Sequence, residues 1–199
     1  SVASFEDFPV RPFGDAPAGD RPFRLGTRVT TNSTTAQRAV NRLVTRSGRD
    51  YPESGQVVLH RVATGTAISW PGGRIPAFDP TVNRIPGVAE GTIGGVGFRQ
   101  DALPVVVHVT DAVSHTWRDY PRTIATATTG AVKAALADIG ARVVTVSQGG
   151  RPFNDLLCEG RLGTFFGAVD ASGPDADWFE LRGASAGDRV RSEEHTSEL

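Results

Sequence analysis

The sequence predicts an α/β domain with a mostly parallel sheet, and three consecutive segments support this class. Residues 104–109 (PVVVHV) are rich in β-branched side chains, which is typical of a strand buried on both faces. Apolar residues then recur at helical spacing from Ile124 to Ile139, and Gly140 follows where a helix commonly ends. Residues 142–147 form another β-branched strand directly after this turn. A short return from helix to strand favours parallel pairing of the two strands.

The first part of the chain adds further elements of both kinds. Residues 2–8 alternate loosely between apolar and polar side chains and predict a strand, and residues 23–30 repeat the alternation. Asn32 or Ser33 can cap a helix whose apolar positions continue over residues 36–45. The first part of the chain therefore predicts two strands followed by a helix.

The middle and the end of the chain are less regular. A weaker helix is expected at residues 57–65, and residues 66–97 are dense in Gly and Pro, which predicts a long irregular insertion. We assign residues 1–150 to one domain. Residues 151–190 are either the end of that domain or the start of a following segment.

Residues 191–199 (RSEEHTSEL) match the in-frame translation of a common sequencing adapter. We therefore interpret this tail as an artefact, expect no ordered contacts from it, and exclude it from the reasoning about the fold.

Composition excludes several classes of function. The 199 residues leave room for one ordinary domain. The formal net charge is -1 and no basic block is present, which argues against nucleic acid as the main partner. No run of apolar residues approaches the length of about 20 that a membrane span requires. Cys158 is the only cysteine, so no disulfide can form within the chain.

Acidic residues stand at positions that suit a metal site. Asp111 ends the strand at residues 104–109, and ligands of open parallel sheets bind outside the carboxyl ends of strands. Asp7 ends the first predicted strand, and Asp50 and Glu53 lie in a polar turn before a helix. Carboxylates are ligands that Mg²⁺ and Ca²⁺ prefer. The alternative is that these acids merely cap helices.

Four short motifs, in order and at similar spacing, resemble the von Willebrand factor A-like domain of integrin β-subunits. They are residues 4–12 (SFEDFPVRP), 49–53 (RDYPE), 97–103 (GFRQDAL) and 109–115 (VTDAVSH). The resemblance extends from about Val2 to Ser147. It implies a three-layer, doubly wound, mostly parallel sheet. It also implies that the first central strand, which would lie between residues 2–8 and 104–109, is missing from this N-terminally truncated chain.

The resemblance further implies a divalent-metal-dependent adhesion or protein-binding module, at the cell surface or outside the cell, rather than an enzyme. Asp111 and Glu53 would face an adhesion site, whose Mg²⁺ or Ca²⁺ would accept a carboxylate from a partner protein. Glu53 would also bridge to a second, Ca²⁺ site that uses the carboxylates of Asp7 and Asp50 and the carbonyl of Pro52. A second cation would offset the repulsion among these crowded acids.

The chain departs from that family at three points. Gly48 occupies the position of an asparagine ligand, the insertion at residues 66–95 is longer, and the Asp-x-Ser-x-Ser loop would precede Ser1. Two alternatives therefore remain. One is a metal-dependent hydrolase that uses Asp111 and His115, although a lone histidine is more often solvated or hydrogen-bonded. The other is a structural module that has lost metal binding.

Overall fold

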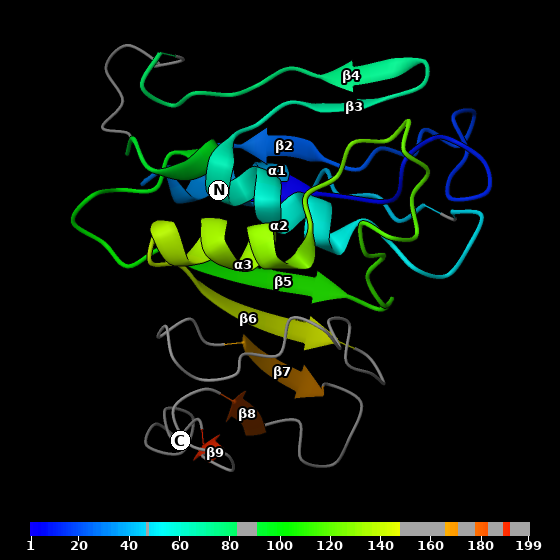
Figure 1. Ribbon diagram of the computed structural model, residues 1–199. Coiled ribbons are helices and arrows are strands. Elements are labelled where there is room, and N and C mark those ends of the chain that lie inside the picture. Colours follow the sequence, from blue (N-terminus) through cyan, green and yellow to red (C-terminus); the bar gives the residue numbers. More distant parts are fainter. Residues whose placement is uncertain (47, 83–90, 148–165, 171–177, 183–188, 192–199) are drawn as a thin grey trace.

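Figure 1 shows the computed structural model, which describes residues 1–46, 48–82 and 91–147 and the backbone of three later strands. The largest sheet has five strands in the order β5-β6-β7-β8-β9. These strands are β5 (Val105–Thr110), β6 (Arg142–Ser147), β7 (Phe166–Asp170), β8 (Trp178–Arg182) and β9 (Arg189–Arg191). β5, β6 and β7 pair in parallel, whereas β8 and β9 are antiparallel additions.

Two smaller antiparallel pairs complete the described strands. β1 (Val2–Ser4) pairs with β2 (Arg24–Thr27), and β3 (Ile68–Trp70) forms a hairpin with β4 (Gly73–Ile75). Among the strands that the structure describes, β1 has β2 as its partner and β5 has β6. The three-layer arrangement and a central strand between β1 and β5 therefore stay predictions.

The predicted strand–helix–strand unit at the centre of the chain is confirmed. α3 (Thr129–Asp138) connects β5 to β6, and Val105 lies opposite Arg142 at the start of the parallel register. The Thr128 side chain caps α3 by accepting a hydrogen bond from the amide of Ala131. Gly140 follows the helix with a φ of 64°, a left-handed conformation that glycine adopts without strain.

The other helices also follow local signals. α1 (Ser33–Val40) begins after Asn32, whose side chain accepts a hydrogen bond from the amide of Thr35, as expected of this cap. α2 (Gly55–Thr64) ends at Gly65, which is left-handed with a φ of 70°. A short 3-10 helix, η1 (Gly94–Val96), lies in the segment expected to be irregular.

Several sequence-based expectations need correction. β1 (Val2–Ser4) and β2 (Arg24–Thr27) are shorter than the strands predicted at residues 2–8 and 23–30. Residues 66–97 are not wholly irregular, because they contain the β3–β4 hairpin and η1. α3 starts after Ile124, which instead packs in the core. Cys158 lies outside the described residues. So do most of the segment at 151–190 and the tail beyond Arg191, the residue that ends β9.

The prediction that β5 is buried on both faces is wrong. Val105, Val107 and Val109 on its outer face are 48%, 63% and 66% exposed. On the opposite face His108 is buried and stacks on Phe5, with ring centroids 5.0 Å apart. Burial lowers the pKa of His108 to about 4, so this imidazole is neutral at pH 7. The helices described here cover only one side of the strand.

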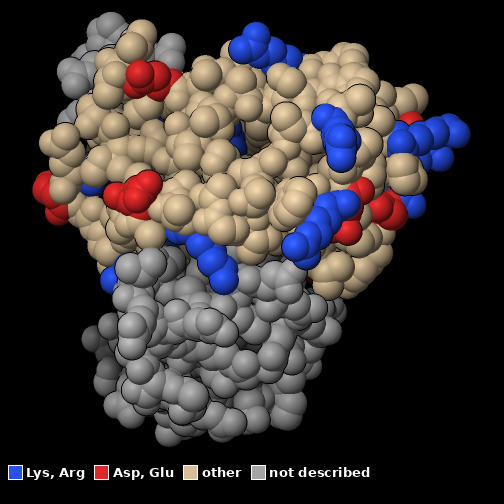
Figure 2. Space-filling model, in the orientation of Figure 1, with Lys and Arg blue, Asp and Glu red and all other residues tan. Residues whose placement is uncertain are grey.

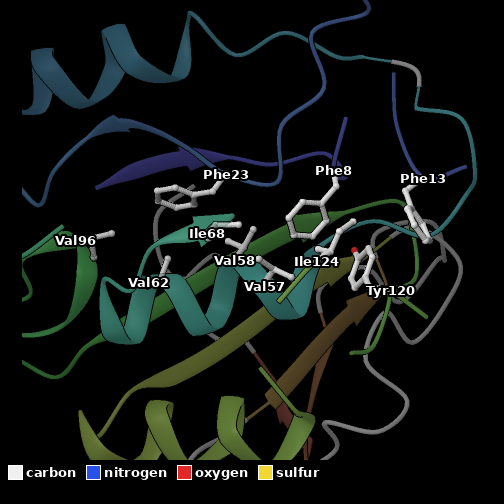
Figure 3. Close-up of a cluster of buried hydrophobic side chains, with 10 residues drawn as sticks. All are labelled: Phe8, Phe13, Phe23, Val57, Val58, Val62, Ile68, Val96, Tyr120 and Ile124. Carbon is white, nitrogen blue, oxygen red and sulfur yellow. The ribbon is translucent and has the colours of Figure 1, made fainter. Parts of the chain in front are cut away.

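Two apolar clusters hold these elements together. The first packs α2 against segments that precede and follow it in the chain. It contains Phe8, Phe13 and Tyr120, and the Tyr120 ring meets the other two edge to face (Figure 3). The second joins α2 to α3 and β6 through Leu59, Leu136 and other fully buried side chains. The aromatic end of the first cluster borders the acidic residues described below.

No helix in the described part of the chain is long and apolar enough to cross a membrane. On the face shown in Figure 2, basic and acidic side chains lie among one another rather than in one patch of a single sign.

Candidate metal centre

Backbone hydrogen bonds bring three distant segments to one place. The amide of Glu53 donates to the carbonyl of Val113 at 2.8 Å, and the amide of His115 donates back to the carbonyl of Glu53 at 2.8 Å. On the other side, the hydroxyl of the fully buried Ser54 donates to the carbonyl of Glu6. The acidic turn is thus fixed between the end of the β1 segment and the segment after β5.

The side chains that meet there are Asp7, Asp50 and His115. Each offers a ligand atom, and these atoms all lie within 4.8 Å of one another. Nε2 of His115 is 3.0 Å from Oδ2 of Asp50 and 3.3 Å from Oδ2 of Asp7. Ligands bound to one ion at about 2.0–2.6 Å lie no farther apart than about 5 Å, so the spacing suits a shared cation.

Asp7 is held rigidly and is 1% exposed. Its Oδ1 accepts hydrogen bonds from the amide of Phe8 at 2.5 Å and from the hydroxyl of Tyr120 at 2.8 Å. Desolvation nevertheless outweighs these bonds and raises the pKa of Asp7 from 3.8 to about 7. Burial and the nearby Asp7 charge also raise the pKa of Tyr120, so its hydroxyl remains a proton donor.

Glu53 adds a further carboxylate close to this group. Burial, together with the negative charges of Asp7, Asp20, Glu6 and Asp50, raises the pKa of Glu53 from 4.5 to about 8. The ionised form of this carboxyl is therefore unfavourable at neutral pH unless positive charge is supplied.

The neighbouring arginines are directed to other acids. Arg24 and Arg46 form ion pairs with Glu6, and Arg49 pairs with Asp15 at 2.9 Å.

Three carboxylate oxygens of the site are buried and accept no hydrogen bond. They are Oδ2 of Asp7, Oδ1 of Asp50 and Oε2 of Glu53. Such oxygens cost free energy when ionised, and a bound divalent cation would satisfy them. The residues present therefore fit a cation.

The other two predicted ligands lie differently. Pro52 is half-buried in the same turn as Asp50 and Glu53. Asp111 is exposed, and its backbone carbonyl accepts a hydrogen bond from the hydroxyl of Tyr51 at 2.6 Å. Asp111 is not part of the group formed by Asp7, Asp50 and His115. Its role as a ligand stays a prediction.

From the sequence, His115, Asp119 and Tyr120 were not expected at this site. His115 stood only in the hydrolase alternative, paired with Asp111, whereas the structure groups it with Asp7 and Asp50. Its position four residues beyond Asp111 gave no signal of this, because the contacts cross 65 positions to Asp50 and 113 positions from Tyr120 to Asp7.

In comparisons with known proteins, no family model and no curated protein matches this chain.

Proposed function

We propose that the chain belongs to a divalent-cation-dependent protein-binding module of the von Willebrand factor A-like kind. The observation that carries the proposal is the convergence of the Asp7 and Asp50 carboxylates with His115. One oxygen each of Asp7, Asp50 and the neighbouring Glu53 is buried without a hydrogen-bond partner. These oxygens, with the carbonyl of Pro52, would hold a divalent cation, for which the resemblance implies Mg²⁺ or Ca²⁺. A bound ion with a coordination position open to solvent would bind a carboxylate of a protein partner.

The turn that contains Asp50 suits this role because it reaches the surface. Tyr51 is 64% exposed, and its hydroxyl binds the segment after β5. A site at the junction of loops, held by a rigid core, is where binding residues commonly occur. Exposed Asp111 lies beside Tyr51 and would face the adhesion cation. A cell-surface or extracellular location follows only from the resemblance.

Hydrolysis is the less favoured alternative. It would pair Asp111 with His115, but His115 groups with two other carboxylates. We therefore propose that the module binds a protein partner rather than catalyses a reaction, and that this binding requires the cation.

The first test is calorimetric titration of the 199-residue chain with Ca²⁺ and Mg²⁺. Asp50→Asn should weaken binding by at least about tenfold, since even outer-shell changes at metal sites cost about 10–100-fold. Asp101→Asn is the matched control, because the Asp101 side chain is 85% exposed and pairs only loosely with Arg99. Equal affinities in all three proteins would contradict the proposed site.

The second test addresses the partner. A peptide array with aspartate-containing peptides and their asparagine counterparts is probed with the protein, with cation and with EDTA. Retention of aspartate peptides only in the presence of cation is expected. Binding that survives EDTA, or that does not distinguish aspartate from asparagine, would contradict metal-mediated carboxylate capture.

A further inference from the structure

The side chain that distinguishes this cluster from an all-oxygen site is His115. Its ring is 8% exposed, and Nε2 points between Oδ2 of Asp50 at 3.0 Å and Oδ2 of Asp7 at 3.3 Å. Asp7 is itself nearly inaccessible, and that same Oδ2 atom accepts no hydrogen bond. A nitrogen and two carboxylate oxygens therefore face a common point inside the protein.

Packing fixes the direction in which Nε2 points. The ring of Phe13 meets the imidazole edge to face with centroids 5.3 Å apart, and the ring of Tyr120 lies 5.1 Å away. Rotation of the imidazole would displace both aromatic rings, which belong to the first apolar cluster. The packing of these rings therefore holds Nε2 in an orientation that faces the carboxylates.

The opposite ring nitrogen faces a carboxylate of its own. Oδ2 of Asp119 lies 3.7 Å from Nδ1 of His115. Asp119 is held by Thr116, whose amide donates at 2.6 Å and whose hydroxyl donates at 2.9 Å. At 3.7 Å the two groups are at ion-pair rather than hydrogen-bond distance. Histidines that bind metals commonly direct their second nitrogen toward a carboxylate in this way.

We infer that His115 is a nitrogen ligand of the cation site, and that the site selects a first-row transition ion such as Zn²⁺ or Mn²⁺ over Mg²⁺ and Ca²⁺. The inference rests on the proposed cation site and specifies its ion. Imidazole favours transition ions, whereas Mg²⁺ and Ca²⁺ bind through oxygen. Asp7 and Asp50 supply the oxygens, His115 the nitrogen, and Asp119 acts as a positioning residue.

The test is competitive titration of the full chain with Zn²⁺, Mn²⁺, Mg²⁺ and Ca²⁺ at one pH. In His115→Gln the side-chain amide occupies about the position of Nε2, so a polar group remains but the imidazole is lost. We expect it to weaken Zn²⁺ and Mn²⁺ binding by at least about tenfold and to leave Ca²⁺ binding unchanged or stronger. His60→Gln is the matched control, because His60 lies on α2 outside the cluster.

A spectroscopic measurement keeps the inference testable if His115→Gln does not fold. Pulsed electron paramagnetic resonance of the wild-type protein loaded with Mn²⁺ should show coupling to a histidine ¹⁴N nucleus. If the wild-type spectrum shows no such coupling, the assignment of His115 as a ligand is wrong. Binding of Ca²⁺ or Mg²⁺ to the wild-type protein that is as tight as that of Zn²⁺ and Mn²⁺ would overturn the selectivity and leave the proposed function intact. Failure of all four ions to bind would overturn both.

Discussion

Nε2 of His115 lies 3.0 Å from Oδ2 of Asp50, although 65 positions separate the two residues in the chain. The contact exists because Glu53, three positions after Asp50, exchanges backbone hydrogen bonds with Val113 and His115. One short parallel bridge between two loops therefore determines which side chains can share an ion.

Asp7→Asn should have opposite effects on stability with and without metal. The asparagine oxygen can keep the hydrogen bonds from Phe8 and Tyr120, while the buried negative charge disappears. We expect denaturant unfolding in EDTA at pH 8 to show equal or greater stability than the wild type. With a saturating cation the order should reverse, because the variant loses an anionic ligand. A variant that is less stable than wild type under both conditions would indicate a purely structural role for Asp7.

The metal-free protein should lose stability as pH rises. The pKa of Asp7 is raised from 3.8 to about 7 and that of Glu53 from 4.5 to about 8, so the folded state binds more protons than the unfolded state between these values. The free energy of unfolding then falls with increasing pH, by up to about 1.4 kcal/mol per pH unit for each group. Urea titrations in EDTA between pH 4 and pH 8 measure the slope.

Asp7→Asn provides the control for that pH dependence, since it should remove the contribution of Asp7 between about pH 4 and pH 7 and leave that of Glu53. A wild-type stability that rises with pH over this interval would contradict the assignment of buried, protonated acids.

Tyr120→Phe should destabilise the protein by about 1–3 kcal/mol, because a buried carboxylate loses a hydrogen-bond donor. The ring remains in place against Phe8 and Phe13, so little packing is lost. Thermal or denaturant unfolding measures the change. Combination with Asp7→Ala, which removes the acceptor, in a double-mutant cycle tests the coupling directly, and additive effects would show that the hydroxyl does not act through Asp7.

Gly48→Asn should strengthen cation binding. A Cβ at this position would lie 3.5 Å from Oε1 of Glu53 and 3.7 Å from the carbonyl oxygen of Asp50, which is ordinary contact. The backbone of Gly48 does not have a positive φ, so asparagine fits without strain. Its amide oxygen adds a ligand beside the acids, and calorimetry should show a lower dissociation constant. Gly48→Ala is the control, and an equal gain from alanine would exclude coordination by the asparagine.

Val107→Lys should reduce aggregation without loss of stability. Val107 is 63% exposed on β5, whose outer face carries two further exposed valines. β5 is also the end strand of its sheet. Exposed apolar end strands promote association between chains, and a lysine opposes it. Light scattering at increasing concentration measures the effect, with Val143→Lys as a buried comparison that should unfold the protein, since Val143 is 0% exposed.

Local signals in the sequence determined most of the helices and the central strand–helix–strand unit. Asn32, Gly65 and Gly140 fix where helices begin and end through one side chain or one backbone conformation. Asp50 and Glu53 in the acidic turn, and Asp7 after the first strand, were predicted to be metal ligands from residue type and resemblance. Asp7 and Asp50 do meet in the structure.

The tertiary structure alone decided the rest. A β-branched run cannot show whether both of its faces are covered, because the covering elements lie elsewhere in the chain, and the outer face of β5 is exposed. The place of His115 depended on the Glu53–His115 backbone bond and on the rings of Phe13 and Tyr120. Sequence periodicity describes neighbours along one element, whereas a metal centre is made by contacts between elements, whose geometry is set only when the core packs.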